Sequence, residues 1–295
     1  MRTAIELKED ELFWKNIDLL EEGTGLSSAF MAKELGLHPL KFQFHRNHQL
    51  IIPFNSVNNF SKSLGLSVEA FWKKDLTSHH FKEAIKINSK KKIPEQYKIG
   101  EGSRSFTVRH IMQVAKKYGI YEDVCEFFGL SDMCFSNTID FNVSVQLASD
   151  ILEFMAAKVD LTDQDFSDMS IANALYFRDS NFGRELSSSK DVIEMYDKFL
   201  NVVNQIEENW SYKIQYADKK MLLLNCYHRE QMANEFKRKD YSSYTFTKFR
   251  VSMAAHLTKY LGLTDTIGTI TKSIHYGDSY CQMKFDYSNA RPLFS

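Results

Sequence analysis

The chain has 295 residues, with 37 Lys and Arg against 38 Asp and Glu, so its formal net charge is −1. This near-neutral charge excludes a histone-like polycation and an acidic tail protein, and 43% hydrophobic residues exclude a disordered chain. The length suits two domains of about 100–200 residues each. Aromatic residues make up 14% of the chain, with only 12 Gly and 4 Pro, so we expect packed cores rather than a loop-rich protein.

The cysteines and the apolar runs indicate the compartment. Cys125, Cys134, Cys226 and Cys281 contain no C-x-x-C pair, which argues against a disulfide framework and a zinc finger. No apolar run approaches the ~18–20 residues of a membrane span, and the charged start does not resemble a signal peptide. We therefore expect a soluble, cytoplasmic protein that does not contact a membrane.

The N-terminal region is predicted to be all-α, with five short helices. Apolar residues recur at helical spacing, and Gly or a capping Ser marks most of the ends. The expected helices are 12–22, 28–35, 39–46, 56–64 and 67–75.

Two segments of this region resemble the XRE (phage repressor-like) helix-turn-helix family. They are LSSAFMAKELGL at 26–37 and VNNFSKSLGLSVEAFW at 57–72. The small Ala32 lets two helices cross closely, Gly36 allows a tight turn, and Leu37 anchors it. The resemblance implies a recognition helix at about 38–46 that enters the major groove of DNA. The DNA-binding candidates are Ser27, Lys41, Gln43, His45 and Arg46.

Two features favour a different use of this helix. Phe42 and Phe44 lie among its polar residues, and residues 1–80 hold nine Lys or Arg against ten Asp or Glu, a net charge of −1. Because non-specific DNA affinity comes mostly from neutralising phosphates, such a domain alone binds DNA weakly. The alternative is a helix-turn-helix fold that no longer binds DNA and contacts a protein through Phe42 and Phe44.

A Lys-rich segment follows, and it is predicted to be a linker. Residues 81–100 hold six Lys and two Glu, a net charge of +4, and Pro94 follows a run of three Lys. A solvated connector is the simpler interpretation, and contact with DNA phosphate is the alternative. The expected organisation is a helix-turn-helix domain at 1–78, a linker at 79–102 and a sensor or dimerisation domain at 103–295.

The C-terminal region is predicted to be α+β, with helices and a small antiparallel sheet covered on one side. Alternation of apolar residues predicts a hairpin around 212–226 and a second one around 270–287. In the second hairpin, Gly277 and Asp278 would form a two-residue turn that sets Ile274 opposite Cys281. The expected helices are 106–118, 143–158, 163–176, 188–209 and 244–261.

The ending HYGDSYCQMKF at 275–285 resembles a Gly-Asp-x-x-Cys-x-Phe hairpin of known sensor domains. These are the 4-vinyl-reductase-like domains and their heme–nitric-oxide-binding relatives, and the ligand-binding region of some AraC-type regulators has a similar outline. The resemblance implies a domain that binds a small molecule between helices and sheet and that dimerises.

Heme and metal are considered but not expected. Heme needs an axial His on a helix, and although His110 and His256 lie on predicted helices, residues 188–209 contain no His. A Tyr-x-Ser-x-Arg clamp is also absent. Cys226 and His228 share a strand face near Cys281, a set that suits zinc, but a cysteine on an apolar face commonly packs as a small hydrophobe. We predict no cofactor and no metal.

No complete catalytic motif is present. The sequence lacks G-x-S-x-G, the P-loop and H-E-x-x-H. Asp160, Asp163, Asp165 and Asp168 are expected to complement a helix dipole, and residues 237–239 are expected to form a solvated loop.

We therefore predict a non-enzymatic DNA-binding transcriptional regulator, acting as a homodimer, whose C-terminal domain senses a small ligand or mediates dimerisation. The alternatives are a protein-interaction protein and a tetrapyrrole-like cofactor protein or enzyme.

Overall fold

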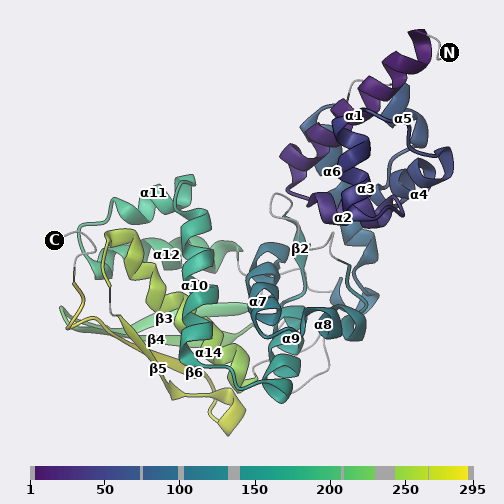
Figure 1. Ribbon diagram of the computed structural model, residues 1–295. Helices are drawn as coiled ribbons and strands as arrows, with labels where there is room; N and C mark the ends of the chain where they lie inside the picture. The colour runs from purple at the N-terminus through teal and green to yellow at the C-terminus, as the bar shows by residue number, and fades with distance from the viewer. Residues whose placement is uncertain are drawn as a thin grey trace. The chain divides into compact units, whose positions relative to one another are not determined.

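The computed structural model describes residues 4–73, 76–98, 103–131, 140–206, 209–229, 243–264 and 266–291 (Figure 1). Its contacts divide the chain into two compact units, 1–94 with 127–141 and 95–126 with 142–295. Cys134 and the basic run at 237–239 lie outside the described residues. Within the described residues, no helix is long and apolar enough to span a membrane.

The first unit is helical, and α1 packs against α5 and α6. The five predicted helices of this region are present, and the first of them begins at Ala4, eight residues earlier than predicted. The elements are α1 (Ala4–Thr24), α2 (Ser28–Glu34), α3 (Pro39–Asn47), α4 (Phe54–Leu64), α5 (Val68–Lys73) and α6 (Ser78–Lys92).

Caps and a left-handed glycine set the turn between α2 and α3. The Ser27 hydroxyl accepts the backbone N–H of Phe30 and so caps α2. Gly36 follows this helix with a φ of 68°, and the N–H of Leu37 returns to the carbonyl of Ala32. A short helix, a tight turn and a second short helix are therefore present, as the sequence predicts.

An aromatic cluster fills the centre of this unit. The ring of Phe71 lies 5.9 Å from Phe13, 5.6 Å from Phe60 and 5.7 Å from Phe81, measured between centroids. All four side chains are fully buried. Their contacts join α1, α4, α5 and α6 into one core.

The predicted linker is wrong over most of its length, because residues 78–92 form α6. Phe81 and Ile85 lie one turn apart on this helix and are buried, while the three Lys of its last turn are exposed. Thr77 and His80 form a capping box at its start. The Lys residues cover the solvent face of a helix that belongs to the first unit.

The second unit begins with η1 (Glu95–Tyr97) and is rich in helices. Its short strands β1 (Ser103–Arg104) and β2 (Asn142–Val143) pair antiparallel. The helices are α7 (Ser105–Lys117), α8 (Tyr121–Phe128, which runs into the first unit), α9 (Val145–Lys158), α10 (Asp163–Phe177), α11 (Asn181–Ser187), α12 (Val192–Ile206), α14 (Tyr244–Ala255) and η3 (His256–Leu261).

A four-stranded antiparallel sheet in the order β3-β4-β6-β5 completes this unit. Tyr212 pairs with Cys226 and Ile214 with Leu224, so the first predicted hairpin is confirmed. Helices α12 and α14 lie against the sheet (Figure 1), and Tyr196 of α12 stacks on Phe285 at 5.5 Å. The strands are β3 (Trp210–Ala217), β4 (Met221–His228), β5 (Ile267–Lys272) and β6 (Cys281–Asp286). The fold class is α+β.

The predicted two-residue turn of the second hairpin is wrong. Lys272 pairs with Gln282, and a longer loop with the turn η4 (Ile274–Tyr276) joins β5 to β6. The Ser273 hydroxyl accepts the N–H of His275, and the Asp278 carboxylate accepts the N–H of Ser273. These side-chain bonds stabilise the loop and end the strand before Ile274, so Ile274 does not face Cys281.

Candidate ligand-binding site

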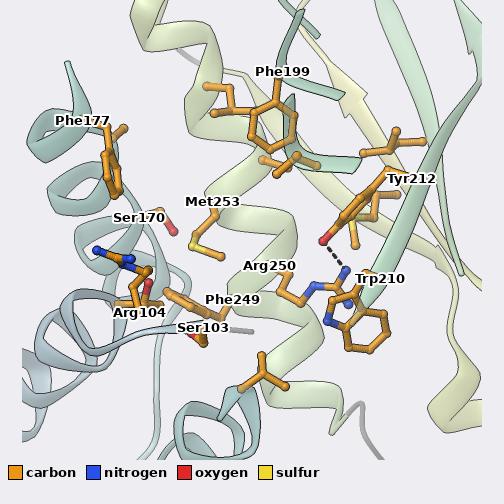
Figure 2. A pocket seen from close by; sticks show the side chains of 18 of the residues that line it. Ser103, Arg104, Ser170, Phe177, Phe199, Trp210, Tyr212, Phe249, Arg250 and Met253 are labelled. Carbon is orange, nitrogen blue, oxygen red and sulfur yellow. Dashed lines mark hydrogen bonds between the residues drawn. The ribbon is translucent and has the colours of Figure 1, made fainter. Parts of the chain in front are cut away.

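A cavity of about 570 Å³ lies inside the second unit, between its helices and the sheet (Figure 2). Its lining is mainly aromatic and aliphatic. Aromatic side chains come from α10, α11, α12, β3 and α14, and Met253 and Met283 add flexible apolar surface. The aromatic residues among the lining are Phe177, Phe182, Phe199, Trp210, Tyr212, Phe246, Phe249 and Tyr260.

Helix α14 supplies one face of this cavity. Phe246, Phe249 and Met253 recur at the spacing of one helical turn and line it. Arg250 occupies a position in the same stripe, one turn after Phe246. A charged side chain therefore lies where the helical pattern calls for an apolar one.

Arg250 is held between two aromatic rings. Its guanidinium carbon lies 3.7 Å from the centroid of the Trp210 ring and 5.5 Å from that of Tyr212. Its Nη2 donates to the Tyr212 hydroxyl and to the Cys226 sulfur, each at 2.8 Å. Figure 2 shows the side chain extending from α14 toward Trp210 and Tyr212 of β3. Burial lowers the pKa of Arg250, but the interactions with Cys226 and Tyr212 outweigh it and raise the pKa.

Two donors at this end of the cavity lack an acceptor among the described residues. They are Nη1 of Arg250, a residue 5% exposed, and Nε1 of Trp210, a residue 1% exposed. No described Asp or Glu forms an ion pair with Arg250. His228 packs its ring against Trp210, and burial together with the charge of Arg250 lowers the pKa of His228 to about 4.

The other end of the cavity is more polar. Figure 2 shows Ser103, Arg104 and Phe177 across α14 from Trp210 and Tyr212. Arg104 is exposed and donates to Asn142 Oδ1 at 2.9 Å. This end therefore reaches solvent.

The histidines considered for heme do not line the cavity. His110 is buried in α7 against Phe106, and burial lowers its pKa to about 4. His256 bonds with Ser167 and with the carbonyl of Ser252. The described lining contains no His or Cys, so it does not fit a heme held by an axial histidine.

The zinc candidates Cys226, Cys281 and His228 have other contacts in the structure. Cys226 lies opposite Cys281 in the sheet, both side chains are buried, and the sulfur of Cys226 accepts from Arg250. No group of three or more His, Cys, Asp or Glu in the described part of the chain is placed to hold a metal ion.

The arginine predicted to read DNA is bound by its own unit. Arg46 of α3 forms ion pairs of 2.6 Å with Asp18 and with Glu21 of α1. Its guanidinium also donates to the Ser28 hydroxyl. These bonds join α3 to α1, and a base contact by Arg46 stays a prediction. Ser27 has a structural role as the cap of α2.

The remaining DNA-binding candidates are distributed around α3. Lys41 and Gln43 are exposed and His45 is half-buried. Phe42 is fully buried, with its ring 5.7 Å from that of Trp14, so the predicted pair of interface phenylalanines is wrong. Phe44 is 55% exposed. Helix α3 thus presents one Phe, not two, to solvent.

Asp165 is the buried member of the predicted acidic group. Lys117 Nζ donates to its carboxylate at 2.7 Å, the Tyr118 hydroxyl at 2.8 Å and the Thr162 hydroxyl at 2.7 Å. Burial raises the pKa of Asp165, but these donors outweigh it and hold the pKa well below its ordinary value. This carboxylate has a structural role at the start of α10.

Similarity to known proteins is found at the level of structure. No protein-family model matches the chain, and no curated protein matches it. The chain is similar in structure to the Fe(II) unliganded H-NOX protein from K. algicida, at 13% identity and a TM-score of 0.44 over 64% of this chain and 97% of that one. A mutant of that protein gives 12% identity and a TM-score of 0.44 over 62% and 96%. The XRE resemblance has no counterpart among these matches.

Sequence reasoning missed Arg250. Arg250 lies within the helix predicted at 244–261, and a basic residue one turn after Phe246 is the indication that the sequence offers. Its neighbours Trp210, Tyr212 and Cys226 lie on strands that pack beside α14 only in the folded unit.

Proposed function

We propose that the protein binds a small, mainly apolar molecule in the cavity of its second unit, and that this binding is its sensing function. The observation that carries the proposal is the cavity itself. Its volume of about 570 Å³ lies within the ~300–1,000 Å³ of small-molecule sites. An aromatic lining with a few polar groups is typical of such sites.

Binding without catalysis is the second part of this proposal. The described lining contains no His, Asp, Glu, Cys or Lys, the side chains that most often act as general bases and nucleophiles. Two hydroxyl groups of the lining donate to backbone carbonyls of the same unit. The Tyr260 hydroxyl donates to the Ala174 carbonyl, and the Ser170 hydroxyl donates to the Phe166 carbonyl.

A cavity-filling variant tests this function directly. The neutral fluorescent probe pyrenebutanol is titrated into the full chain and into Ala254→Phe, which adds a ring to the cavity wall. We expect binding to the unchanged chain and at least about tenfold weaker binding to Ala254→Phe. Ala157→Phe is the matched control, because Ala157 is exposed on α9 and away from the cavity. Equal probe affinity in all three proteins contradicts the proposal.

The second candidate function is contact of α3 with a macromolecule, as in the regulator that the sequence predicts. The exposed Lys41 and Gln43 favour DNA, while Leu40, 76% exposed, and Phe44 favour a protein. A salt-titrated DNA-binding assay separates the two. Loss of sequence-specific affinity in Gln43→Ala supports DNA reading, and uniform weak binding that Gln43→Ala does not change supports a protein contact.

A further inference from the structure

Arg250 and Trp210 each have a hydrogen-bond donor without a described acceptor at one end of the cavity. A buried guanidinium is costly unless an acceptor compensates each of its donors. Nη2 of Arg250 has two acceptors, but one of them is a sulfur, which is a weak acceptor. Nη1 of Arg250 and Nε1 of Trp210 have none in the described part of the chain. One group with two oxygens could satisfy both.

The positions of these donors limit what that group can be. The guanidinium stacks on the indole at 3.7 Å, so both nitrogens belong to one small region of the cavity wall. The neighbouring His228 is neutral at pH 7, since its pKa is about 4. The local charge is therefore positive, from Arg250 in the cavity wall and from Arg229, which donates to the Trp210 carbonyl. An anion in this mainly apolar surrounding is attracted far more strongly than in water.

We infer that the natural ligand is a carboxylic acid with an apolar, flat or hydrocarbon body, and that its carboxylate binds Arg250 and Trp210. This inference rests on the proposed function, because it specifies the ligand of the same cavity. The body fills the space between the aromatic rings of α10, α12 and α14. The carboxylate accepts from Nη1 of Arg250 and from Nε1 of Trp210.

Binding of this group requires a side-chain movement. Both nitrogens are buried, so a carboxylate reaches them only when neighbouring side chains move. The Tyr212 hydroxyl gives up its bond to Nη2 in one such movement. The fluorescence of Trp210 therefore reports arrival of the anion as well as occupancy of the cavity.

A matched pair of probes tests the inference on the full chain. Pyrenebutanoate and pyrenebutanol share one apolar body, and at pH 7 the first is a carboxylate while the second is neutral. We expect pyrenebutanoate to bind the unchanged chain at least about tenfold more tightly, as for a charge-assisted hydrogen bond in a buried site. In Arg250→Met we expect this preference to vanish, because pyrenebutanoate loses its charged partner and pyrenebutanol does not.

Three further variants control for charge and folding. Lys248→Met removes a positive charge from the same helix at a residue outside the lining, and we expect it to keep the preference. Arg250→Lys retains the charge and should keep a reduced preference. Trp210→Phe keeps an aromatic ring but removes the indole donor, and it should weaken pyrenebutanoate binding more than pyrenebutanol binding. Circular dichroism confirms that each variant is folded.

The outcomes separate this inference from the proposed function. Equal affinity of the two probes for the unchanged chain overturns the inference and leaves the proposed function intact. That comparison needs no variant, so it holds even if Arg250→Met fails to fold. A preference that survives in Arg250→Met also overturns the inference. Binding of neither probe overturns both.

Discussion

The two units differ in the partners that each provides for an arginine side chain. In the first unit, Arg46 lies near the surface and two carboxylates bind it. In the second unit, Arg250 is buried against aromatic rings, and no described carboxylate pairs with it. The charge of Arg46 is therefore balanced by carboxylates of its own unit, and these ion pairs have a structural role. Arg250 lacks such a carboxylate among the described residues, which is typical of an arginine that binds a ligand.

The aromatic residues differ between the units in the same way. In the first unit the ring of Phe71 contacts those of Phe13, Phe60 and Phe81, and all four side chains are fully buried. In the second unit the aromatic side chains surround a cavity of about 570 Å³. A high aromatic content therefore marks a closed core in one unit and a binding site in the other.

Truncation of an aromatic ring gives the largest expected effect and tests this contrast. Phe71→Ala opens a new cavity in a closed core and should lower the free energy of unfolding by about 3–5 kcal/mol. Phe199→Ala enlarges an existing cavity at a half-buried side chain and should cost only about 1–2 kcal/mol. Urea unfolding followed by circular dichroism measures both. Equal losses would show that the second unit packs as tightly as the first.

Asp165 shows that the second unit can pair a buried charge. Its folded-state pKa lies below the ordinary value of about 4. The carboxylate therefore contributes stability above pH 4, and the contribution is lost as the pH falls below this value. Asp165→Asn should cost about 1–3 kcal/mol at pH 7 and show a flatter loss of stability between pH 5 and pH 2. Parallel pH profiles of the two proteins would contradict the pairing with Lys117.

The sequence predicts local structure well wherever neighbouring residues decide it. Ser27 and Gly36 mark the ends of α2, and the predicted helix and turn follow. The sequence does not predict contacts that depend on distant residues. The burial of Phe42 depends on Trp14 in another helix, and the ion pairs of Arg46 depend on Asp18 and Glu21.

The errors at α6 and at Arg250 also come from distant residues, whereas the error at the second hairpin comes from local side-chain bonds. The charge of the Lys residues obscured the apolar stripe of α6, because Phe81 and Ile85 need α1 to be recognised as a core face. The hairpin prediction used alternation alone, whereas side-chain bonds of Ser273 and Asp278 end β5 early. Arg250 becomes a candidate only when the sheet brings Trp210 and Tyr212 beside α14.

Replacing each arginine by methionine should change stability in opposite directions. Arg46→Met leaves two neighbouring carboxylates without their cation and should lower the free energy of unfolding by about 0.5–1 kcal/mol. Arg250→Met removes a buried charge and should leave stability unchanged or raise it by up to about 2 kcal/mol. Thermal denaturation at low ligand concentration checks both signs. A large loss in Arg250→Met would show that the guanidinium stabilises the fold itself.

The pKa of His228 gives the smallest and most local test of Arg250. Burial and the charge of Arg250 together hold this pKa at about 4, below its ordinary 6.5. In Arg250→Met the guanidinium charge is lost while His228 stays buried, so NMR titration should show a higher pKa that is still below 6.5, with Lys248→Met as the unchanged control. Saturating pyrenebutanoate should also raise the pKa, because its carboxylate offsets the guanidinium charge, whereas pyrenebutanol should raise it less. An identical pKa in all these samples would mean that burial alone acts on His228 and that no anion binds beside Arg250.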